Sequence, residues 1–357
     1  MQLSEFDYEL PEELIAQQPL ERRDASRMLI VNREAQTMED SRFELLPEYV
    51  QPGDIIVVNN TRVFPARLIG QRDPSGGRVE VLLISKLESE ESAVERDGAD
   101  SQTWEALVRP AHRLKPGERI RFGDSNLQGE VLENSGKGFR LVRLQGDKPV
   151  ESLIGELGQT PLPPYIRRPQ GTSSADDERY QTVFAREKGA IAAPTAGLHF
   201  TPAVTEALLA RQAQLVEITL HVGYGTFQPV RVDNIEQHQV DPEYCEISEE
   251  AARMISAGRT QGGRVIAVGT TTVRALESAV NSEGAVEPGR RKTGLTIIPG
   301  YKFRVTDALL TNFHLPRSSL LLLVCAFAGR NLTLEAYRYA VKARFRFYSY
   351  GDCMLVI

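Results

Sequence analysis

Three histidines lie in segments whose composition could support acid–base chemistry. His199 lies in the loop 193–202, His221 ends a strand-like run, and His314 lies in the polar segment 311–319. The ordinary pKa of imidazole is close to neutrality, so such a side chain can donate or accept a proton during a reaction. A lone histidine is also commonly a hydrogen-bonded structural residue, and the sequence leaves that alternative open for each of the three.

Two glycines in the segment 220–229 would let the backbone approach a ligand closely. Gly223 and Gly225 flank Tyr224, and the rings of Tyr224 and Phe227 could stack on a nucleobase. No third glycine completes a dinucleotide-binding fingerprint. The segment is therefore either part of a binding site or a simple turn at the end of a strand.

A buried strand leads through Gly269 into a helix whose first turn contains Thr270 and Thr271, with Arg274 one turn further on. The N-terminus of a helix attracts anions through its free N–H groups and the helix dipole. A phosphate or the carboxylate of an amino acid would fit, although ordinary capping by the threonines gives the same pattern. No Gly-Lys-Ser/Thr follows, so the segment is not a P-loop.

Two further loops place polar side chains beside the expected start of a helix. Thr195 and Gly197 precede one helix, and Asn312 and Arg317 precede the most apolar helix of the chain. An arginine at a helix N-terminus is electrostatically unfavourable, so Arg317 indicates a nearby anion. Both loops could line a polar site at the rim of the core, or they are capping turns with surface charges.

Basic residues are concentrated in two stretches, 104–121 and 330–346, although the net charge of the chain is -6. Binding to phosphates depends on such local patches more than on the total charge. Solvated faces often show the same clustering, so the composition permits an RNA partner without requiring one. The candidate contacts are Arg109, Arg113, Lys115, Lys342, Arg344 and Arg346.

The elements that must position these segments alternate between strands and helices at both ends of the chain. Asp54–Val58 is an apolar run typical of a strand buried on both faces of a parallel sheet. Further strands are expected at 28–31, 216–222 and 264–268, and helices at 43–50, 201–211, 248–259, 270–279 and 318–328.

The pattern between residues 67 and 157 is different. Short strand-like runs are separated by Gly, Asp, Ser and Pro turns, which is typical of a small barrel or sandwich, with the acidic run 88–100 as a loop. We therefore expect an α/β main domain, residues 1–66 and 158–357, interrupted by an inserted all-β, barrel-like domain, residues 67–157. A chain of 357 residues is long enough for two such domains.

Composition indicates a globular protein of a reducing compartment. The chain is 41% hydrophobic and 25% charged, and its beginning lacks the basic and apolar regions of a signal peptide. Leu320–Ala328 is the longest apolar run and is too short to span a bilayer. Three cysteines form no C-x-x-C pair, and no cluster has the spacing of metal ligands. We expect a soluble, cytoplasmic protein with no membrane contact and no metal.

Taken together, these segments resemble those of a known family over essentially the whole chain. The chain resembles the S-adenosylmethionine:tRNA ribosyltransferase-isomerases of queuosine synthesis. The matching motifs are FDYELPEELIAQQPLERRDASRML, NNTRVFPARL, GQTPLPPYIRR, APTAGLHFT, HVGYGTFQPVR, VGTTTVRALES, TNFHLPRSSLLLLVCAFAG and FRFYSYGD, in the order of the family.

The resemblance implies a transferase that modifies tRNA with a GUN anticodon carrying 7-aminomethyl-7-deazaguanine at the wobble position. Such enzymes transfer and isomerise the ribosyl moiety of S-adenosylmethionine, giving epoxyqueuosine-tRNA, adenine and methionine. S-adenosylmethionine is consumed as a co-substrate, and no cofactor is expected. The implied fold is an α/β domain with an inserted β-barrel.

Roles for the candidate residues follow as hypotheses from this resemblance. We expect acid–base catalysis by His199, His221 or His314, and contact of the basic residues with the anticodon arm. The expected substrate-binding residues are Thr195, Gly197, Gly223, Tyr224, Gly225, Phe227, Gly269, Thr270, Thr271, Arg274, Asn312 and Arg317. The alternatives are another S-adenosylmethionine-dependent RNA-modifying enzyme, such as a methyltransferase, and a non-catalytic tRNA-binding protein.

Overall fold

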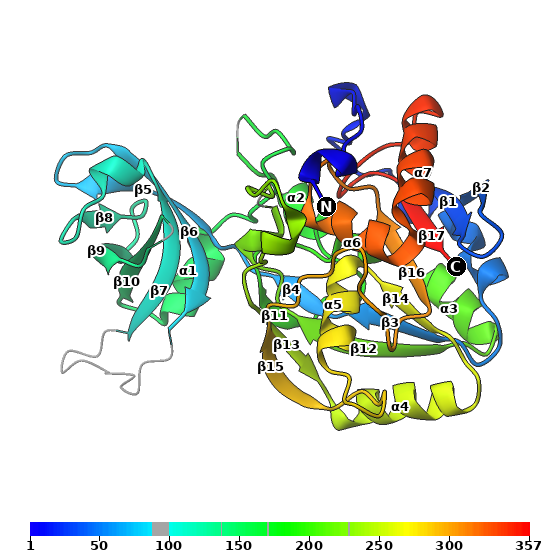
Figure 1. Ribbon diagram of the computed structural model, residues 1–357. Helices are drawn as coiled ribbons and strands as arrows, with labels where there is room; N and C mark the ends of the chain where they lie inside the picture. Colours follow the sequence, from blue (N-terminus) through cyan, green and yellow to red (C-terminus); the bar gives the residue numbers. More distant parts are fainter. Residues whose placement is uncertain (88–99, 137, 170, 228) are drawn as a thin grey trace. The chain divides into compact units, whose positions relative to one another are not determined.

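The computed structural model describes residues 1–87, 100–136, 138–169, 171–227 and 229–357 (Figure 1). The chain divides into two compact units. Unit 1 comprises Met1–Arg62, Pro163–Pro169 and Arg179–Ile357, and unit 2 comprises Val63–Leu162 and Gln170–Glu178. The inserted domain predicted at residues 67–157 lies within unit 2. The expected loop at 88–100 falls, but for its last residue, outside the described residues.

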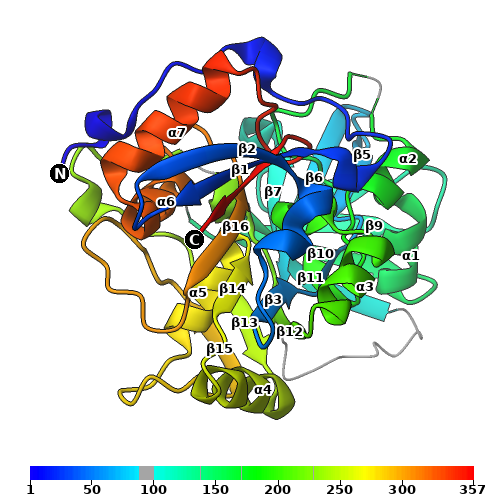
Figure 2. The same ribbon diagram turned by 90° about the vertical axis from the view of Figure 1, so that its right-hand side faces the viewer.

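A nine-stranded mixed sheet forms the centre of unit 1, in the order β15-β13-β12-β3-β14-β16-β17-β1-β2. Strands β12, β3, β14 and β16 are mutually parallel, and β17 and β13 run antiparallel to this group (Figure 2). The bounds are β1 Arg27–Asn32, β2 Thr37–Arg42, β3 Ile55–Asn59, β12 Gln214–Leu220, β13 Glu243–Ile247, β14 Val265–Val268, β15 Gly289–Thr293, β16 Ala308–Asn312 and β17 Cys353–Val356.

Every residue of β3 is buried, as expected for a strand with parallel neighbours and both faces covered. Side chains alternate between the two faces, so Ile55 and Val57 join one hydrophobic cluster while Ile56 and Val58 join the other. The sequence therefore predicted this strand and β14 correctly. It missed β15, whose sequence Gly-Arg-Arg-Lys-Thr is mostly exposed and carries no apolar signal.

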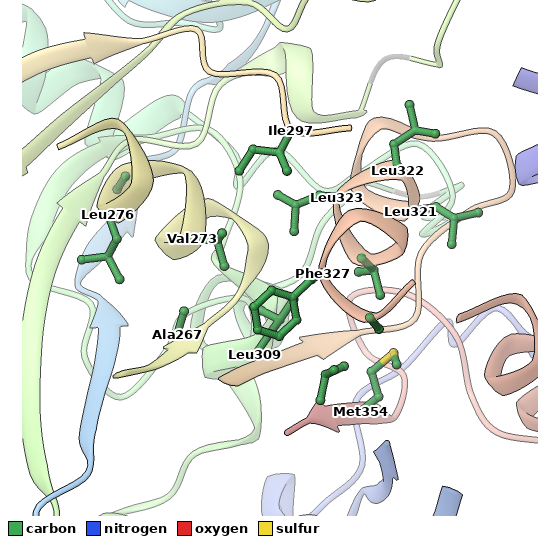
Figure 3. Close-up of a cluster of buried hydrophobic side chains, with 14 of the residues drawn as sticks. Ala267, Val273, Leu276, Ile297, Leu309, Leu321, Leu322, Leu323, Phe327 and Met354 are labelled. Carbon is green, nitrogen blue, oxygen red and sulfur yellow. The ribbon is translucent and has the colours of Figure 1, made fainter. Parts of the chain in front are cut away.

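Helices cover both faces of this sheet. The first cluster contains the apolar sides of α4 (Glu249–Thr260), α5 (Thr270–Ser278), α6 (Ser319–Ala328) and α7 (Arg330–Lys342), and the second contains α3 (Pro202–Ala210) and η4 (Phe43–Tyr49). Figure 3 shows Val273 of α5 and Leu323 of α6 above Ala267 and Leu309 of the sheet. Most of α6 is buried on this face, which explains why it is the most apolar helix.

Side-chain caps fix where three of these helices begin. The hydroxyls of Thr201, Ser248 and Ser318 accept hydrogen bonds from the N–H groups of Val204, Ala251 and Leu321. Pro202 occupies the first turn of α3, where its missing N–H is not needed. The helix predicted at 201–211 is therefore confirmed, with Thr201 as its cap.

Unit 2 contains a closed barrel of six strands in the order β10-β7-β6-β5-β8-β9. Close packing inside this small barrel demands a glycine at position 70, because a Cβ there would lie 2.7 Å from the carbonyl oxygen of Arg121. The predicted fold class, an α/β domain with an all-β barrel-like domain, is confirmed. The bounds are β5 Arg67–Asp73, β6 Arg78–Lys86, β7 Asp100–Arg109, β8 Arg119–Arg121, β9 Gln128–Asn134, β10 Phe139–Gly146, with α1 Val150–Leu157 packed beside it.

The remaining elements are short. Strands β4 (Thr61–Val63) and β11 (Glu187–Ala190) form a two-stranded sheet, and α2 spans Ser174–Arg179. No single helix within the described ranges is long and apolar enough to cross a membrane. Helices α6 and α7 would reach that length only as a pair, and they are bent by 117° at their junction.

A buried ion pair joins the amino ends of the two central strands. The Asp54 carboxylate, only 2% exposed, accepts from the guanidinium of Arg264 at 2.6 and 3.1 Å and from the backbone N–H groups of Arg264 and Gln51. These charge-assisted bonds hold β3 and β14 at a common starting level. Their opposite ends, where the candidate site residues lie, are thereby set in register.

We expect Asp54→Asn to lower the free energy of unfolding by about 3 kcal/mol, because it leaves a partly buried guanidinium without its counter-charge. Denaturant unfolding monitored by circular dichroism measures this change. Asp40→Asn is the matched control, since Asp40 pairs with Arg27 at 2.7 Å on the surface and its loss should cost less than about 1 kcal/mol. Equal effects of the two substitutions would contradict the structural role of Asp54.

Candidate functional site

Most of the candidate residues gather at one edge of the sheet in unit 1. Parallel strands β12, β3, β14 and β16 end there, followed respectively by His221, Asn60, Gly269 and Phe313. Strands β17 and β1 begin at the same edge because they run the other way. In open α/β sheets, ligands bind outside the carboxyl ends of the strands, so this edge is the candidate active site.

His199 lies above this edge in the short helix η6 (Thr195–His199) and is completely buried within a hydrogen-bonded network. Its Nδ1 lies 2.7 Å from the hydroxyl of Ser26, and its Nε2 lies 3.1 Å from the amide nitrogen of Asn312. The Asn312 amide also donates to the carbonyl oxygen of Tyr348 and accepts from the Thr195 hydroxyl. Two predicted site residues, Thr195 and Asn312, thus belong to one network with His199.

The partners of this network determine the tautomer of His199. The Asn312 NH₂ group carries two hydrogens. One is donated to the carbonyl of Tyr348, and the other is donated to His199 Nε2. Ser26 donates its own hydrogen to the carbonyl of Arg23 and therefore accepts from His199 Nδ1. The proton of the neutral imidazole accordingly resides on Nδ1, and Nε2 carries the lone pair.

Burial also fixes the charge of this histidine. Loss of solvation, together with the smaller effect of the positive charges of Arg346 and Arg23, lowers the pKa of His199 from 6.5 to about 3. A group with this pKa is neutral throughout the physiological range, so it cannot act as a proton donor there. As it stands, His199 is a rigid hydrogen-bonding residue more than an acid.

His314 is a buried residue of the core. Burial lowers its pKa to about 3, and its Nε2 lies 2.9 Å from the Thr311 hydroxyl. Its backbone connects two aromatic residues, because its N–H donates to the Tyr337 hydroxyl and its carbonyl accepts from the Tyr8 hydroxyl. These contacts tie the N-terminal segment and α7 to the end of β16.

His221 is the most accessible of the three predicted histidines. Its Nδ1 lies 2.7 Å from the Thr61 hydroxyl, and its ring stacks on Tyr244 at 5.5 Å between centroids. Within the described chain Nε2 makes no hydrogen bond. Partial burial lowers the pKa of His221, while the carboxylates of Glu187 and Glu246 oppose that shift. A Cβ on Gly189 would lie 2.7 Å from Nε2, so only glycine leaves room for this ring.

The N-terminus of α5 is open to a ligand. Gly269 precedes the helix with φ 92° and caps it with no side chain, and the hydroxyl of Thr272 donates back to the carbonyl of Val268. The N–H groups and the hydroxyls of Thr270 and Thr271 find no partner among the described residues, although both residues are buried. Capping by these threonines, the alternative from the sequence, is therefore not observed. The Cα of Gly269 faces Ala196 of η6, so Gly197 and its neighbours border this helix start.

A buried ion pair holds the Gly223–Gly225 turn. The Glu243 carboxylate accepts from the N–H of Gly223 at 2.9 Å and from the guanidinium of Arg274 at 2.5 Å, and Arg274 also donates to the carbonyl oxygens of Leu295 and Thr293. The side chains of Arg274 and Glu243 are 6% and 4% exposed. Arg274 thus shapes the site through Glu243. Tyr224 begins the helix η7 (Tyr224–Phe227), and the side chain of Phe227 lies outside what the structure describes.

Two pockets of different charge open near this edge. The Arg274 pocket contains the neutralised pair Arg274–Glu243 and an apolar wall that includes Leu295, Ile297 and Leu323. The His199 pocket, about 300 Å³, is lined by Arg23, Arg179 and Ser349 as well as by Ser26 and His199. The first pocket therefore contains the carboxylates of Glu243 and Asp241 beside the Arg274 guanidinium, whereas the second contains guanidinium groups and no carboxylate among its lining residues.

Other predicted contacts lie on the surface. The anion indicated by Arg317 is the chain's own Asp7, with which it forms an ion pair, so its position at the helix start needs no ligand. Arg344 lies 3.9 Å from Glu13, and Lys342 ends α7 in solvent. Arg346 is half-buried beside the His199 pocket. Arg109, Arg113 and Lys115 are exposed on the barrel of unit 2.

Sequence reasoning missed several residues of the site, namely Ser26, Thr61, Glu243, Arg23 and Arg179. Ser26 and His199 are 173 positions apart, and a short serine carries no signal of its own. Glu243 and Arg274 are 31 positions apart, and no motif in the sequence marks the carboxylate as the partner of the guanidinium. No group of three or more His, Cys, Asp or Glu side chains that could hold a metal ion is found in the described part of the chain.

Comparison with known proteins gives the family context. A family model described as queuosine biosynthesis protein matches residues 3–356. A relative from Symbiobacterium thermophilum is 50% identical over 357 residues, covering 100% of both chains, and one from Natranaerobius thermophilus is 46% identical, covering 100% of this chain and 99% of the relative. Both are named S-adenosylmethionine:tRNA ribosyltransferase-isomerase. The crystal structure of an S-adenosylmethionine tRNA ribosyltransferase from Thermotoga maritima is 37% identical, with a TM-score of 0.55 over 99% of this chain and 100% of that one.

The lowered pKa values of His199 and His314 predict how stability varies with pH. Between pH 3 and 6.5 the unfolded chain binds a proton at each residue that the folded chain does not, so stability falls as the pH decreases through this window. We expect His199→Gln to reduce the slope of unfolding free energy against pH by about 1.4 kcal/mol per pH unit near pH 5, and the double variant with His314→Gln by about twice that. Denaturant titrations at several pH values measure the slopes. If the variants showed the same slope of unfolding free energy against pH as the wild type, the two histidines would not be buried in the neutral form.

Proposed function

The chain belongs to the queuosine biosynthesis family, and on that premise we propose that it is an S-adenosylmethionine:tRNA ribosyltransferase-isomerase. It transfers and isomerises the ribosyl moiety of S-adenosylmethionine onto 7-aminomethyl-7-deazaguanine of tRNA, giving epoxyqueuosine-tRNA, adenine and methionine. The observation that carries the proposal is full-length identity of 45–50% to relatives that share this one name.

Finer features of the proposal follow from the substrate. The tRNA has a GUN anticodon, with the modified base at the wobble position, and the enzyme works in the cytoplasm where such tRNA is found. S-adenosylmethionine is a co-substrate, and the reaction as proposed needs no further cofactor. The exposed basic side chains Arg109, Arg113, Lys115, Lys342 and Arg344 contact the anticodon arm.

We assign S-adenosylmethionine to the Arg274 pocket on grounds of charge and polarity. Its sulfonium and ammonium groups give the molecule a net positive charge, which the guanidinium groups of the His199 pocket would repel. The Arg274 charge is compensated by Glu243, and the apolar wall suits a thioether chain or a purine face. Gly223 and Gly225 let the backbone border this pocket, with Tyr224 beside it.

The methionine carboxylate fits the N-terminus of α5. Free N–H groups and the helix dipole favour an anion there, and the unpartnered hydroxyls of Thr270 and Thr271 add two donors. Gly269 permits close approach because its backbone conformation, φ 92°, excludes most side chains. The first turn of α5 borders η6, and Arg274 lies about one helical turn further along the same helix.

The reaction needs a base that removes a proton from C5′ of the ribosyl group, which the adjacent sulfonium makes acidic. Among the three histidines, His221 fits this role best. Its Nε2 is accessible and unpartnered in the described chain, Thr61 and Tyr244 hold the ring, and its lowered pKa keeps it unprotonated at neutral pH. We assign His199 and His314 to positioning, because burial keeps both neutral, both ring nitrogens of His199 have hydrogen-bond partners, and Nε2 of His314 contacts the Thr311 hydroxyl.

Incubation of the protein with tRNA bearing the aminomethyl-deazaguanine and S-adenosylmethionine labelled in the ribose tests the function. We expect label in tRNA together with free adenine and methionine. Methyl label in RNA with S-adenosylhomocysteine as by-product would instead identify a methyltransferase. Binding of tRNA without consumption of S-adenosylmethionine would identify a binding protein.

Substitution of His221 tests its role as the base. We expect His221→Gln to lower kcat by about 10²–10⁴-fold while KM for S-adenosylmethionine changes little, because general base catalysis contributes about this much. In the wild type, kcat should rise with pH through an apparent pKa below 6.5, and the variant should lack this limb. A variant with turnover within threefold of the wild type would exclude His221 as the base.

A further inference from the structure

Three arginines lie in or beside the His199 pocket. Arg23 and Arg179 line it, and Arg346 is close enough for its charge to lower the pKa of His199. The three come from distant parts of the sequence, namely η3 (Arg23–Ala25), the end of α2 and the segment after α7. Their convergence on one small pocket is therefore a property of the fold, and no single basic stretch of the sequence produces it.

The hydrogen bonds of the Arg179 and Arg346 guanidinium groups leave positive charge at the pocket, although the Asp352 carboxylate, which accepts from the backbone N–H of Arg346 at 2.7 Å, offsets part of the Arg346 charge. Arg179 donates to the backbone carbonyls of Glu21 and Leu20, and Arg346 donates to that of Gln18. Neither forms an ion pair with a carboxylate of the described chain, and none of the residues that line the pocket is acidic. Carbonyl groups satisfy N–H donors but do not neutralise a cation.

Two N–H groups of these arginines remain without an acceptor. Arg179 Nε and Arg346 Nη1 are buried and make no hydrogen bond within the described residues. Buried donors of this kind are rare in folded proteins and are usually satisfied by a ligand, an ion or water. Positive charge and unused donors together indicate that an anion completes the pocket.

The wall between His199 and Arg346 is rigid. Tyr348 adopts a left-handed conformation, φ 72°, and its carbonyl accepts from Asn312, while the next residue, Ser349, lies 2.6 Å from the Tyr165 hydroxyl. Tyr165 and Tyr348 pack ring against ring, with centroids 4.0 Å apart. The pocket is thus preformed, as a site for a specific group requires.

We propose that the His199 pocket binds a backbone phosphate of the substrate tRNA next to the nucleotide that is modified. This inference rests on the proposed function. A phosphodiester is favoured over the carboxylate of S-adenosylmethionine because several guanidinium groups match phosphate oxygens and would repel the sulfonium and ammonium groups. The phosphate bound in this pocket then fixes the position of the RNA strand at the edge of the sheet, while the co-substrate occupies the Arg274 pocket.

The test compares Arg179→Gln and Arg346→Gln with the wild type. We expect each variant to bind a tRNA transcript about tenfold more weakly, because a charge-assisted hydrogen bond is lost. The slope of log Kd against log salt, measured by fluorescence anisotropy between about 50 and 200 mM KCl, should decrease by about one. KM for tRNA should rise by about the same factor of ten. KM for S-adenosylmethionine should stay within about twofold of the wild type, since this pocket does not hold it.

Arg211→Gln is the matched control, because Arg211 is exposed at the end of α3 and away from the pocket lining. It should leave binding and its salt dependence unchanged. Arg346→Lys, which keeps the charge, should restore the salt dependence. Thermal unfolding of each variant shows whether it is folded, and two separate arginine positions keep the test valid if one substitution disrupts folding.

Stem-loop RNAs with a single neutral methylphosphonate identify the phosphate. At one position the neutral linkage should weaken binding by the wild type about tenfold and binding by Arg346→Gln by a smaller factor, because Arg23 and Arg179 still contact the phosphate in that variant. A rise in KM for S-adenosylmethionine with unchanged tRNA binding would overturn the inference in favour of the carboxylate. Wild-type tRNA binding that neither substitution alters would overturn the inference alone, whereas a wild-type protein that binds no tRNA would overturn the proposed function itself.

Discussion

The carboxamide of Asn312 connects segments that are far apart in the sequence and on which the candidate site depends. It lies at the end of β16, bonds to Thr195 and His199 of η6, and donates to the carbonyl of Tyr348. A carboxamide can donate and accept at once, and this arrangement uses both capacities. The network thereby determines the tautomer of His199, the position of η6 beside Gly269 and the conformation of the wall that carries Ser349.

Charge separates the two sides of the site. On one side Glu243 compensates Arg274 inside the protein, so the pocket presents little net charge to a cationic molecule. On the other side the guanidinium groups of Arg179 and Arg346 donate to backbone carbonyls and form no ion pair with a carboxylate of the described chain, so they keep most of their charge. The same residue type therefore serves opposite purposes, and the difference depends on whether a carboxylate lies within reach.

The sequence predicts those parts of the fold that rely on local patterns. The apolar run of β3, the helices expected at 201–211 and 318–328, and the change of pattern near residue 67 each have a local physical cause. Strand β15 escapes prediction because its side chains are solvated and its pairing with β13 is decided elsewhere in the chain. Within the site, motif matches locate His199 and Asn312, but the contacts of Ser26 and Glu243 arise from long-range packing that no spacing encodes.

The segment around Tyr348 has a consequence for protein engineering. Its left-handed backbone, the buried and unpaired hydroxyl of Tyr348 and the buried Nη1 of Arg346 each oppose stability. A redesign that scores only the folded free energy would replace Tyr348 with glycine and Arg346 with an apolar residue. Thermostable variants obtained in that way would have fewer unsatisfied buried groups but would lose part of the binding surface. Stabilising redesign of this protein should therefore leave residues 344–350 unchanged.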